Sequence, residues 1–314
     1  EGKDVLVLAA GEPDFDTPSN IRKAAFDAME NGQTRYVPGK GTPALQKAIQ
    51  TKFIKDNNIE YSLDEIIVGV GGKHIIYNAM MATLNPNDEV IIPAPFWVSY
   101  PDIVLLAEGK PIIVECPESQ NFKITANQLE KSITEKTKWL MLNSPSNPTG
   151  AVYSKSELKE LAEVLLKYPH VLIMSDDIYE KIIYDNLEFG TLASIEPRLK
   201  ERCLTLNGVS KAYCMTGWRL GYCGASKEII AAMNKMQSQS NTSTSSISMA
   251  AAVEALEGSQ EFIKEHNEAF VRRRDMVVSS LNQIEGINCL TPEGAFYVYP
   301  SCKGVIGKQT PDGK

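Results

Sequence analysis

Short apolar segments alternate with helical stretches between residues 66 and 223, and this alternation restricts the possible folds more than any other feature of the chain. Each segment has the length of a strand. Strands joined through helix-length connections pair in parallel, with helices on both faces of the sheet. The pattern therefore predicts an α/β fold built on a seven-stranded, mostly parallel sheet covered by helices. The expected strands cover residues 66–70, 90–92, 111–115, 138–142, 171–175, 202–206 and 220–223.

Signals for helix starts support this pattern. Thr42 followed by Pro43 suits an N-cap and a first-turn proline. Ser154 with Glu157 forms a capping box before a helical run of leucines. Beyond residue 223 the pattern becomes mainly helical. The elements expected outside the sheet are helices at residues 227–237, 248–256 and 261–284, a Ser/Thr/Asn-rich break at 238–246, and strands at 5–10 and 293–299.

The chain length of 314 residues is enough for one large and one smaller domain. We expect a large domain at residues 20–247, which contains the sheet. Residues 1–19 and 248–314 are expected to form part of a small α+β domain that is incomplete at both ends of the chain. The chain begins without an initiator Met, so we also expect residues upstream of Glu1.

Charge and cysteine usage narrow the possible partners. The net charge of -7 favours neither nucleic acid nor an anionic membrane surface, and no apolar run approaches the ~20 residues of a membrane span. Three widely separated histidines and six cysteines without metal-binding spacing argue against a metal centre. No secretory signal is visible, and the cysteines are typical of reduced thiols in the core of a cytoplasmic protein.

Side chains suited to chemistry follow the expected strands where each strand ends. Ligands of open α/β sheets bind outside the carboxyl ends of the strands, so we expect these side chains to share one crevice. Gly71, Gly72 and Lys73 open a helix after the first strand, where backbone N–H groups and a cation suit a phosphate. The other strand ends carry Trp97 after the second strand, Asn147 after the fourth, Asp176 and Tyr179 after the fifth, and Lys211 after the sixth.

Each of these residues, taken singly, has an ordinary structural explanation. A lysine such as Lys211 is most often solvated, Trp97 is more often a core aromatic than not, and Gly11 fits a plain turn as well as a ligand contact. Together they offer an amine nucleophile, a deep carboxylate, an aromatic plate and a phosphate cradle. This set matches pyridoxal 5'-phosphate, which needs a lysine for a Schiff base, an acid beside its pyridine nitrogen and a phosphate site.

Two other site types lack their sequence signals. No Gly-x-Gly-x-x-Gly motif follows a strand, which disfavours a dinucleotide-binding fold. No histidine lies near a nucleophile elbow, so a Ser/His/Asp triad has no support from the sequence.

The chain resembles the class I aminotransferases among the fold-type I pyridoxal phosphate enzymes, and within them the bacterial-type aspartate aminotransferases. The resemblance covers nearly the whole chain, and its motifs are specific in their order and spacing. They are Ala-Gly-Glu-Pro-Asp-Phe at 10–15, Tyr36 with Gly41 and Leu45 downstream, Gly-Gly-Lys at 71–73, Pro-Phe-Trp at 95–97, Asn-Ser-Pro-Ser-Asn-Pro-Thr-Gly at 143–150, Ser-Asp-Asp-Ile-Tyr at 175–179 and Ser-Lys-Ala-Tyr-Cys-Met-Thr-Gly-Trp-Arg at 210–219.

The resemblance implies a role for each matching residue. Lys211 would form the internal aldimine with the cofactor and move the proton between the substrate Cα and the cofactor. Asp176 would pair with the pyridine nitrogen, Tyr179 and Asn147 would hydrogen-bond the phenolic oxygen, and Trp97 would stack on the ring. The implied phosphate contacts are Gly71, Gly72, Lys73, Ser210 and Arg219, with Tyr36 from a second subunit. The implied substrate contacts are Gly11, Lys73, Trp97 and Asn147.

The implied reaction is a ping-pong transamination between L-aspartate and 2-oxoglutarate, which forms oxaloacetate and L-glutamate in a cytoplasmic homodimer with shared active sites. Three alternatives stay open at this point. The first is an aspartate/prephenate or other amino-acid aminotransferase, the second is a lyase of the same fold, and the third is a non-catalytic module that binds the cofactor.

Two features depart from the family pattern. Gly208 stands three residues before Lys211, where many relatives place a phosphate-binding serine, so one hydroxyl contact is expected to be absent. The arginine with which this family holds the substrate α-carboxylate would follow residue 314. The polypeptide as written is therefore expected to bind amino acids poorly.

Overall fold

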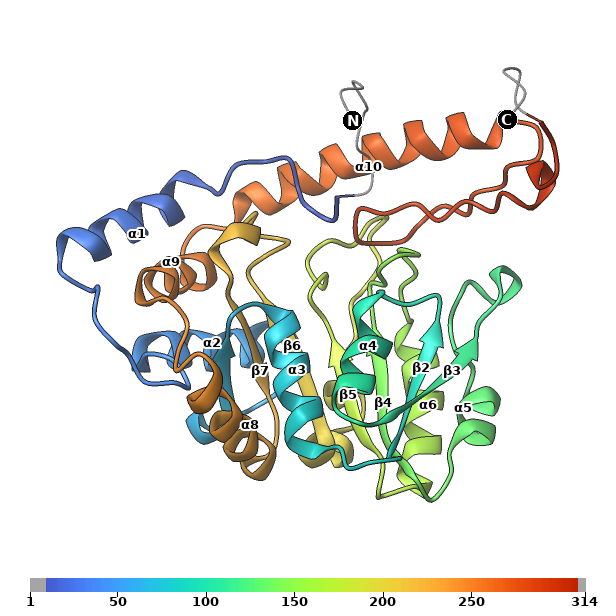
Figure 1. Ribbon diagram of the computed structural model, residues 1–314. Coiled ribbons are helices and arrows are strands. Elements are labelled where there is room, and N and C mark those ends of the chain that lie inside the picture. The colour runs from blue at the N-terminus through green and yellow to red at the C-terminus, as the bar shows by residue number, and fades with distance from the viewer. Residues whose placement is uncertain (1–9, 310–314) are drawn as a thin grey trace.

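The computed structural model describes residues 10–309, and a seven-stranded sheet lies at its centre (Figure 1). The strand order is β1-β7-β6-β5-β4-β2-β3. Strand β7 runs antiparallel to both of its neighbours and the other pairs are parallel. The predicted mostly parallel sheet is confirmed. The strands are β1 (Ile66–Gly69), β2 (Glu89–Ala94), β3 (Lys110–Glu115), β4 (Thr137–Asn143), β5 (Leu172–Asp176), β6 (Cys203–Gly208) and β7 (Gly221–Gly224).

Helices connect and cover these strands. The α-helices of the described residues are α1 (Ser19–Glu30), α2 (Pro43–Asn57), α3 (Gly72–Thr83), α4 (Ser99–Leu106), α5 (Ala126–Ser132), α6 (Lys155–Lys167), α7 (Leu192–Ile195), α8 (Lys227–Ser240), α9 (Ser246–Glu257) and α10 (Glu261–Asn282). Short 3-10 turns lie at Leu63–Glu65, Glu118–Gln120, Pro197–Arg202, Thr216–Trp218 and Lys303–Val305.

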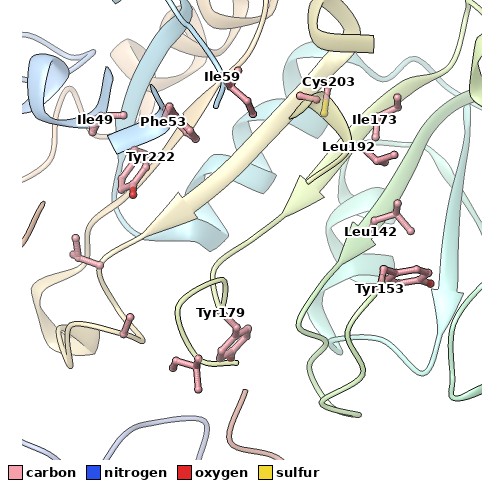
Figure 2. Close-up of a cluster of buried hydrophobic side chains, with 14 of the residues drawn as sticks. Ile49, Phe53, Ile59, Leu142, Tyr153, Ile173, Tyr179, Leu192, Cys203 and Tyr222 are labelled. Carbon is pink, nitrogen blue, oxygen red and sulfur yellow. The ribbon is translucent and has the colours of Figure 1, made fainter. Parts of the chain in front are cut away.

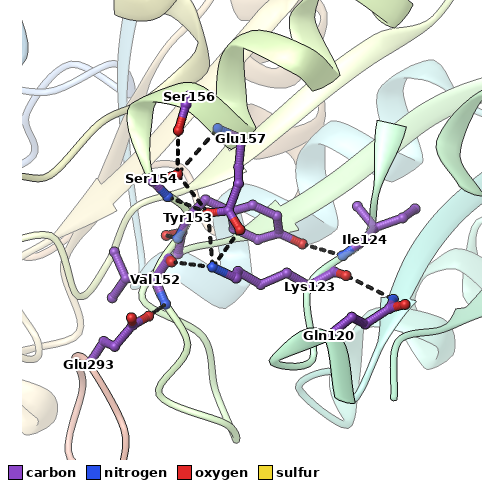
Figure 3. Close-up of polar contacts among 10 residues, drawn as sticks. Gln120, Lys123, Ile124, Val152, Tyr153, Ser154, Ser156, Glu157 and Glu293 are labelled. Carbon is purple, nitrogen blue, oxygen red and sulfur yellow. Dashed lines mark hydrogen bonds and ion pairs between the residues drawn. The ribbon is translucent and has the colours of Figure 1, made fainter. Parts of the chain in front are cut away.

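The predicted helix starts are confirmed by their caps. Thr42 Oγ1 accepts a hydrogen bond from the N–H of Leu45 at 3.3 Å, and Pro43 occupies the first turn of α2. At the start of α6, Ser154 Oγ accepts from the N–H of Glu157 at 3.2 Å, and the Glu157 carboxylate accepts from the N–H of Ser154 at 2.8 Å (Figure 3). Each cap satisfies N–H groups that the helix itself leaves unpaired.

Two apolar cores lie on opposite faces of the sheet, because successive side chains of a strand alternate between its faces. In β4, Leu140 and Leu142 belong to one core, whereas Trp139 and Met141 belong to the other. Residues of α2, α6 and α9 complete the first core, part of which is drawn in Figure 2. Residues of α3, α4 and α8 complete the second. The strands are thus covered on both faces, which leaves their carboxyl ends as the place for a site.

The predicted strand at residues 293–299 is wrong. Among the described residues this segment makes only an isolated bridge between Gly294 and Ile183. Ala295 has a φ of 55°, which interrupts an extended chain. The N–H groups of Glu293 and Gly294 both donate to Gly150 O, at 3.0 and 2.9 Å, so loops satisfy this backbone instead of a ladder. Of the strand predicted at residues 5–10, residues 5–9 lie outside the described residues.

Hydrogen bonds to distant loops place the 293–299 segment at the carboxyl edge of the sheet. The N–H of Ala295 donates to Ile182 O at 2.9 Å, just beyond the end of β5. In Figure 1, this red segment and α10 lie beside the edge of the sheet toward which β2 and β3 point. This C-terminal segment therefore borders the strand ends.

The cysteines are all free thiols. Five of them are buried, as expected for core thiols, but Cys302 is exposed. Within residues 10–309, no helix combines the length and the apolar character that crossing a membrane requires.

Candidate active site

A cavity of about 400 Å³ lies at the carboxyl ends of the strands. This is the edge at which open α/β sheets bind ligands. Ten of the twelve residues singled out from the sequence line it, although they come from seven separate stretches of the chain. They are Gly11, Gly72, Lys73, Trp97, Asn147, Asp176, Tyr179, Ser210, Lys211 and Arg219.

Asp176 is a buried carboxyl group that lines this cavity. It ends β5, and Tyr100 Oη donates to its Oδ2 at 2.6 Å while the N–H of Ile178 donates to its Oδ1 at 3.3 Å. Burial raises the pKa of Asp176 to about 6, although these hydrogen bonds and the charge of Lys211 act in the opposite direction. Asp176 is therefore poised to hold a proton or to pair with a cation in the cavity.

Lys211 presents its amine to the same cavity. Its Nζ donates to the backbone oxygen of Gly11 at 2.5 Å and lies 5.7 Å from the centre of the Tyr179 ring. Burial lowers the pKa of Lys211, and the neighbouring charge of Arg219 lowers it further. A lysine that gives up its proton more readily is a better nucleophile and a better general base.

A chain of polar groups joins Tyr179, Tyr297 and Asn147. The hydroxyl groups of Tyr179 and Tyr297 are 2.6 Å apart, and Asn147 Nδ2 donates to Tyr297 Oη at 3.5 Å. Asn143 fixes the loop behind them, because its Oδ1 accepts from the N–H of Asn147 at 2.7 Å and its Nδ2 donates to Asp176 O at 2.9 Å. These hydrogen-bonded side chains present phenol and amide groups to a ligand in the cavity.

An anion cradle is built around the start of α3. Gly71 has a φ of 84°, and a Cβ there would lie 2.5 Å from Arg219 Nη2, so the guanidinium packs directly on the glycine backbone. A Cβ on Gly221 would lie 2.5 Å from the N of Gly72. Glycine at these positions lets the N-terminus of a helix, two strand ends and an arginine converge, which is an arrangement that binds phosphate.

Lys73 and Trp97 also line the cavity. Lys73 Nζ lies 4.8 Å from the centre of the Trp97 ring. Ser210 lines the cavity. A Cβ at Gly208 would lie 2.9 Å from Ile178 Cδ1 and 3.1 Å from Leu220 O, so the space for a side chain is already filled at this position.

The cavity residues fit pyridoxal phosphate. The glycine-lined cradle with Arg219 suits its phosphate, Lys211 supplies the amine, and Asp176 is a carboxyl group that no arginine or lysine pairs with directly among the described residues. An acid without a cationic partner can pair with a pyridine nitrogen. The cavity therefore supplies the amine, the carboxyl group and the anion site that the cofactor predicted from the sequence requires.

Two predicted site residues do not line the cavity. Gly71 lies just behind it, under Arg219. Tyr36 is 94% exposed and projects away from the chain, so the contact predicted for it within a second subunit stays a prediction.

Several cavity residues were not predicted from the sequence. Tyr100 comes from α4, and Tyr297 from the segment predicted to be a strand. Glu12 and Thr216 also line the cavity, and Thr216 Oγ1 donates to the Glu12 carboxylate. Glu12 and Thr216 lie within the motifs at 10–15 and 210–219. For Tyr100 and Tyr297, no strand end or motif signals the role.

Comparisons with known proteins agree with this geometry. The model of the family "Aminotransferase class I and II" matches residues 3–310. The chain is 56% identical over 314 residues to the aspartate aminotransferase of Rhizobium meliloti (strain 1021), a match that covers 100% of this chain and 77% of that protein. It is also 56% identical over 312 residues to the aspartate/prephenate aminotransferase of Cereibacter sphaeroides, with 99% of this chain and 78% of that protein covered.

Solved structures are similar over the same length. The crystal structure of the Rhizobium meliloti aspartate aminotransferase superposes with a TM-score of 0.98 at 56% identity, covering 100% of this chain and 78% of that one. The aspartate aminotransferase of Thermus thermophilus with maleate superposes with a TM-score of 0.90 at 41% identity, covering 93% of this chain and 76% of that one.

Proposed function

The chain belongs to the class I and II aminotransferase family and is a pyridoxal phosphate-dependent aminotransferase, and from this premise we propose that it transfers the amino group of L-aspartate to 2-oxoglutarate. The products are oxaloacetate and L-glutamate. The observation that carries this proposal is one cavity that holds the Lys211 amine, the Asp176 carboxyl group and the glycine-lined cradle. Bound there, pyridoxal phosphate supplies an electron-accepting ring that eases bond breaking at the substrate Cα.

Lys211 is the proposed catalytic base and the residue that holds the cofactor. Its lowered pKa favours the neutral amine, which is able to take the proton from the substrate Cα and return it. The hydrogen bond to Gly11 O directs Nζ across the cavity, which limits the positions from which the proton is taken.

Asp176 is proposed to keep a proton on the pyridine nitrogen. Its position at the end of a buried strand and the hydrogen bond from Tyr100 hold the carboxylate in one orientation. Tyr179 and Asn147 are proposed to hydrogen-bond the phenolic oxygen of the cofactor, and Trp97 to cover its ring. All four side chains line the same cavity, which supports these roles.

The phosphate is proposed to lie in the cradle. Gly71 and Gly72 offer the N-terminus of α3, while Lys73, Ser210 and Arg219 offer cationic and hydroxyl donors. We propose a homodimer in which Tyr36 completes this site from the partner chain. The exposure of Tyr36 in a single chain supports that arrangement.

A dicarboxylic substrate fits the charges of the cavity. Lys73 offers a cation beside Trp97 at one side of the cavity, and Gly11 and Asn147 offer further contacts. The relatives named as aspartate aminotransferases at 56% identity and the neighbour solved with maleate support the same substrate class. The division into a large domain at residues 20–247 and a small one, together with a cytoplasmic location, stays part of the proposal.

A second candidate is amino transfer to prephenate. The observation that favours it is the 56% identity to a relative named as an aspartate/prephenate aminotransferase. The two candidates share the cofactor site and differ only in the acceptor.

Product analysis separates these functions. The natural protein is supplied with L-aspartate and either 2-oxoglutarate or prephenate, and oxaloacetate, L-glutamate and the aminated prephenate are quantified. We expect oxaloacetate and L-glutamate in equal amounts. Release of ammonia without an acceptor indicates a lyase, and no product with any amino donor contradicts the proposal. Lys211→Ala is the control, and we expect it to lose about 10²–10⁴-fold or more in rate.

A further inference from the structure

The turn after β5 carries polar side chains on both of its sides. Asp176 and Tyr179 face the cavity, whereas Asp177 and Glu180 lie behind it and are only 1% and 9% exposed. The backbone of the turn is closed by the N–H of Glu180, which donates to Asp177 O at 2.9 Å. Whatever holds Asp177 and Glu180 therefore also sets the positions of the two cavity residues.

Glu180 is held by a closed triangle of polar groups from α2. The Lys52 ammonium forms an ion pair with Glu180 Oε1 and donates to Asn57 Oδ1 at 2.6 Å. Asn57 Nδ2 donates in turn to Glu180 Oε2 at 2.7 Å. The side chains of Lys52 and Glu180 are 2% and 6% exposed, so water does not screen this contact. Both oxygens of the Glu180 carboxylate are thereby fixed.

Asp177 lies beside this triangle without a cation of its own. Ser175 Oγ donates to its Oδ1 at 2.8 Å, and its Oδ2 has no hydrogen-bond partner among residues 10–309. Burial raises the pKa of Asp177 well above the usual range, and the charge of Glu180 raises it further while Lys52 opposes the shift. The ionised form of Asp177 is therefore disfavoured, and the Lys52 ammonium forms its ion pair with Glu180.

A buried ion pair is an inefficient way to stabilise a fold, because the cost of removing both charges from water offsets much of their attraction. Well-packed apolar residues of similar volume often stabilise a fold as well or better. The triangle of Lys52, Asn57 and Glu180 does something that an apolar trio does not, since its hydrogen bonds fix the direction of the carboxylate. Tyr179, the neighbour of Glu180, then has little freedom to move.

We propose that Lys52 is a positioning residue, which acts through Glu180 and Asn57 to set the places of Asp176 and Tyr179 in the cavity. This inference rests on the proposed role of the cavity as the cofactor site. It makes α2 a support for the active site as well as a core helix. It also explains why a lysine without solvent exposure stands on the buried side of that helix.

The test compares three variants of the full protein. Lys52→Met keeps the length of the side chain and removes its charge. Asn57→Ala removes one hydrogen bond to Glu180 and leaves the ion pair. Lys200→Met is the matched control, because Lys200 pairs with the buried Glu65 at 2.9 Å. Glu65 directly precedes β1, and Lys200 lies in the 3-10 turn before β6, so this pair is at the amino ends of the strands.

Three quantities are measured for each variant. They are the dissociation constant of pyridoxal phosphate, the pH midpoint of the visible absorbance of the bound cofactor, and the Tm of the cofactor-free chain. We expect Lys52→Met to weaken cofactor binding by roughly tenfold or more and to move the pH midpoint. Asn57→Ala should change both in the same direction by less. Lys200→Met should lower the Tm and leave both cofactor properties unchanged.

A purely structural role predicts a different result. Lys52→Met and Asn57→Ala would then lower the Tm as Lys200→Met does, with cofactor affinity and pH midpoint unchanged, and this outcome would overturn the proposal. If Lys52→Met does not fold, Asn57→Ala alone decides between the two results. None of these measurements uses an amino-acid substrate, so they stay independent of the test for aspartate transamination.

Discussion

Two adjacent carboxyl groups, Asp176 and Asp177, have different properties because their side chains lie in different surroundings. They face opposite sides of the strand end, and burial raises the pKa of both. Asp176 faces the cavity and has Tyr100 and Lys211 to favour its charged form. Asp177 faces the core, with Glu180 opposing its ionisation. Only Asp176 is therefore available to exchange a proton or pair with a cation when a ligand enters.

The raised pKa of Asp176 predicts a pH-dependent stability. Between its ordinary pKa of 3.8 and its folded pKa of about 6, the folded chain binds more protons at this carboxyl than the unfolded chain. Stability from this group is thus present in acid and lost as the pH rises through that window. Asp176→Asn cannot titrate at this position and so does not show this loss. We expect the free energy of unfolding of the cofactor-free variant, relative to that of the cofactor-free wild type, to rise by about 3 kcal/mol from about pH 4 to about pH 7.

Urea denaturation of the two cofactor-free proteins at both pH values measures this difference. Tyr100→Phe provides a second check, because it removes the hydrogen bond that lowers the pKa of Asp176. In Tyr100→Phe, the pH range over which stability is lost should therefore extend to higher pH. Parallel stability curves for wild type and Asp176→Asn would contradict the assignment.

A substitution of Lys73 tests whether this side chain binds the substrate or the phosphate of the cofactor. Its Nζ lies over the Trp97 ring rather than among the glycines of the cradle, so we expect its charge to act mainly on the distal carboxylate of the substrate. Lys73→Met should raise KM for aspartate by about tenfold, which is the scale of one lost hydrogen bond to a charged group. The dissociation constant of pyridoxal phosphate should change less. A larger effect on cofactor binding than on KM would assign Lys73 to the phosphate instead.

At the scale of elements, the strands of the sheet were predictable because each is an apolar run of strand length between helices. The ends of β5 and β6 then located Asp176 and Lys211, since the carboxyl ends of parallel strands meet at one edge. This reasoning needs only local pattern and topology. Seven of the eight residues predicted in this way line one cavity, whereas Ser210 and Arg219 were assigned to it only through the family resemblance.

The remaining cavity residues depend on packing that no local pattern encodes. Tyr100 reaches Asp176 because α4 packs across the sheet, and nothing in its sequence distinguishes it from a core tyrosine. Residues 293–299 have the apolar and aromatic composition of a strand, but their hydrogen bonds go to Gly150 and Ile182 in loops. Tyr297 enters the cavity only as a result of those contacts.

The capping box at the start of α6 gives a prediction about how much this helix cap stabilises the fold. Ser154→Ala removes the acceptor for the N–H of Glu157, and we expect the free energy of unfolding to fall by about 1 kcal/mol. Ser156→Ala is the matched control, because Ser156 lies two residues later and, among the described residues, its side chain hydrogen-bonds only to Ser154 Oγ, at 3.0 Å (Figure 3). Urea denaturation measures both. Equal losses in the two variants would mean that the cap contributes nothing specific.

At the scale of the whole molecule, Tyr36 is the predicted site residue whose contact depends on a second copy of the chain. Its ring is 94% exposed, yet the loop that carries it is anchored. Gln237, which is fully buried, donates to Gly39 O at 2.6 Å and to Val68 O at 2.8 Å. An aromatic side chain held outward on an anchored loop is suited to entering a second copy of the chain.

Mixed dimers test this shared site. Lys211→Ala and Tyr36→Ala each damage every site of their own homodimer, but a hybrid dimer contains one site in which both residues are intact. After random mixing of equal amounts, roughly one quarter of all sites should recover. Lys211→Ala mixed with Asp176→Asn is the matched control and should recover nothing, because both residues serve the site of their own chain. Transamination rates of the mixtures measure the recovery. No gain with Tyr36→Ala would mean that Tyr36 does not act across a dimer interface, and the shared site would have to be abandoned.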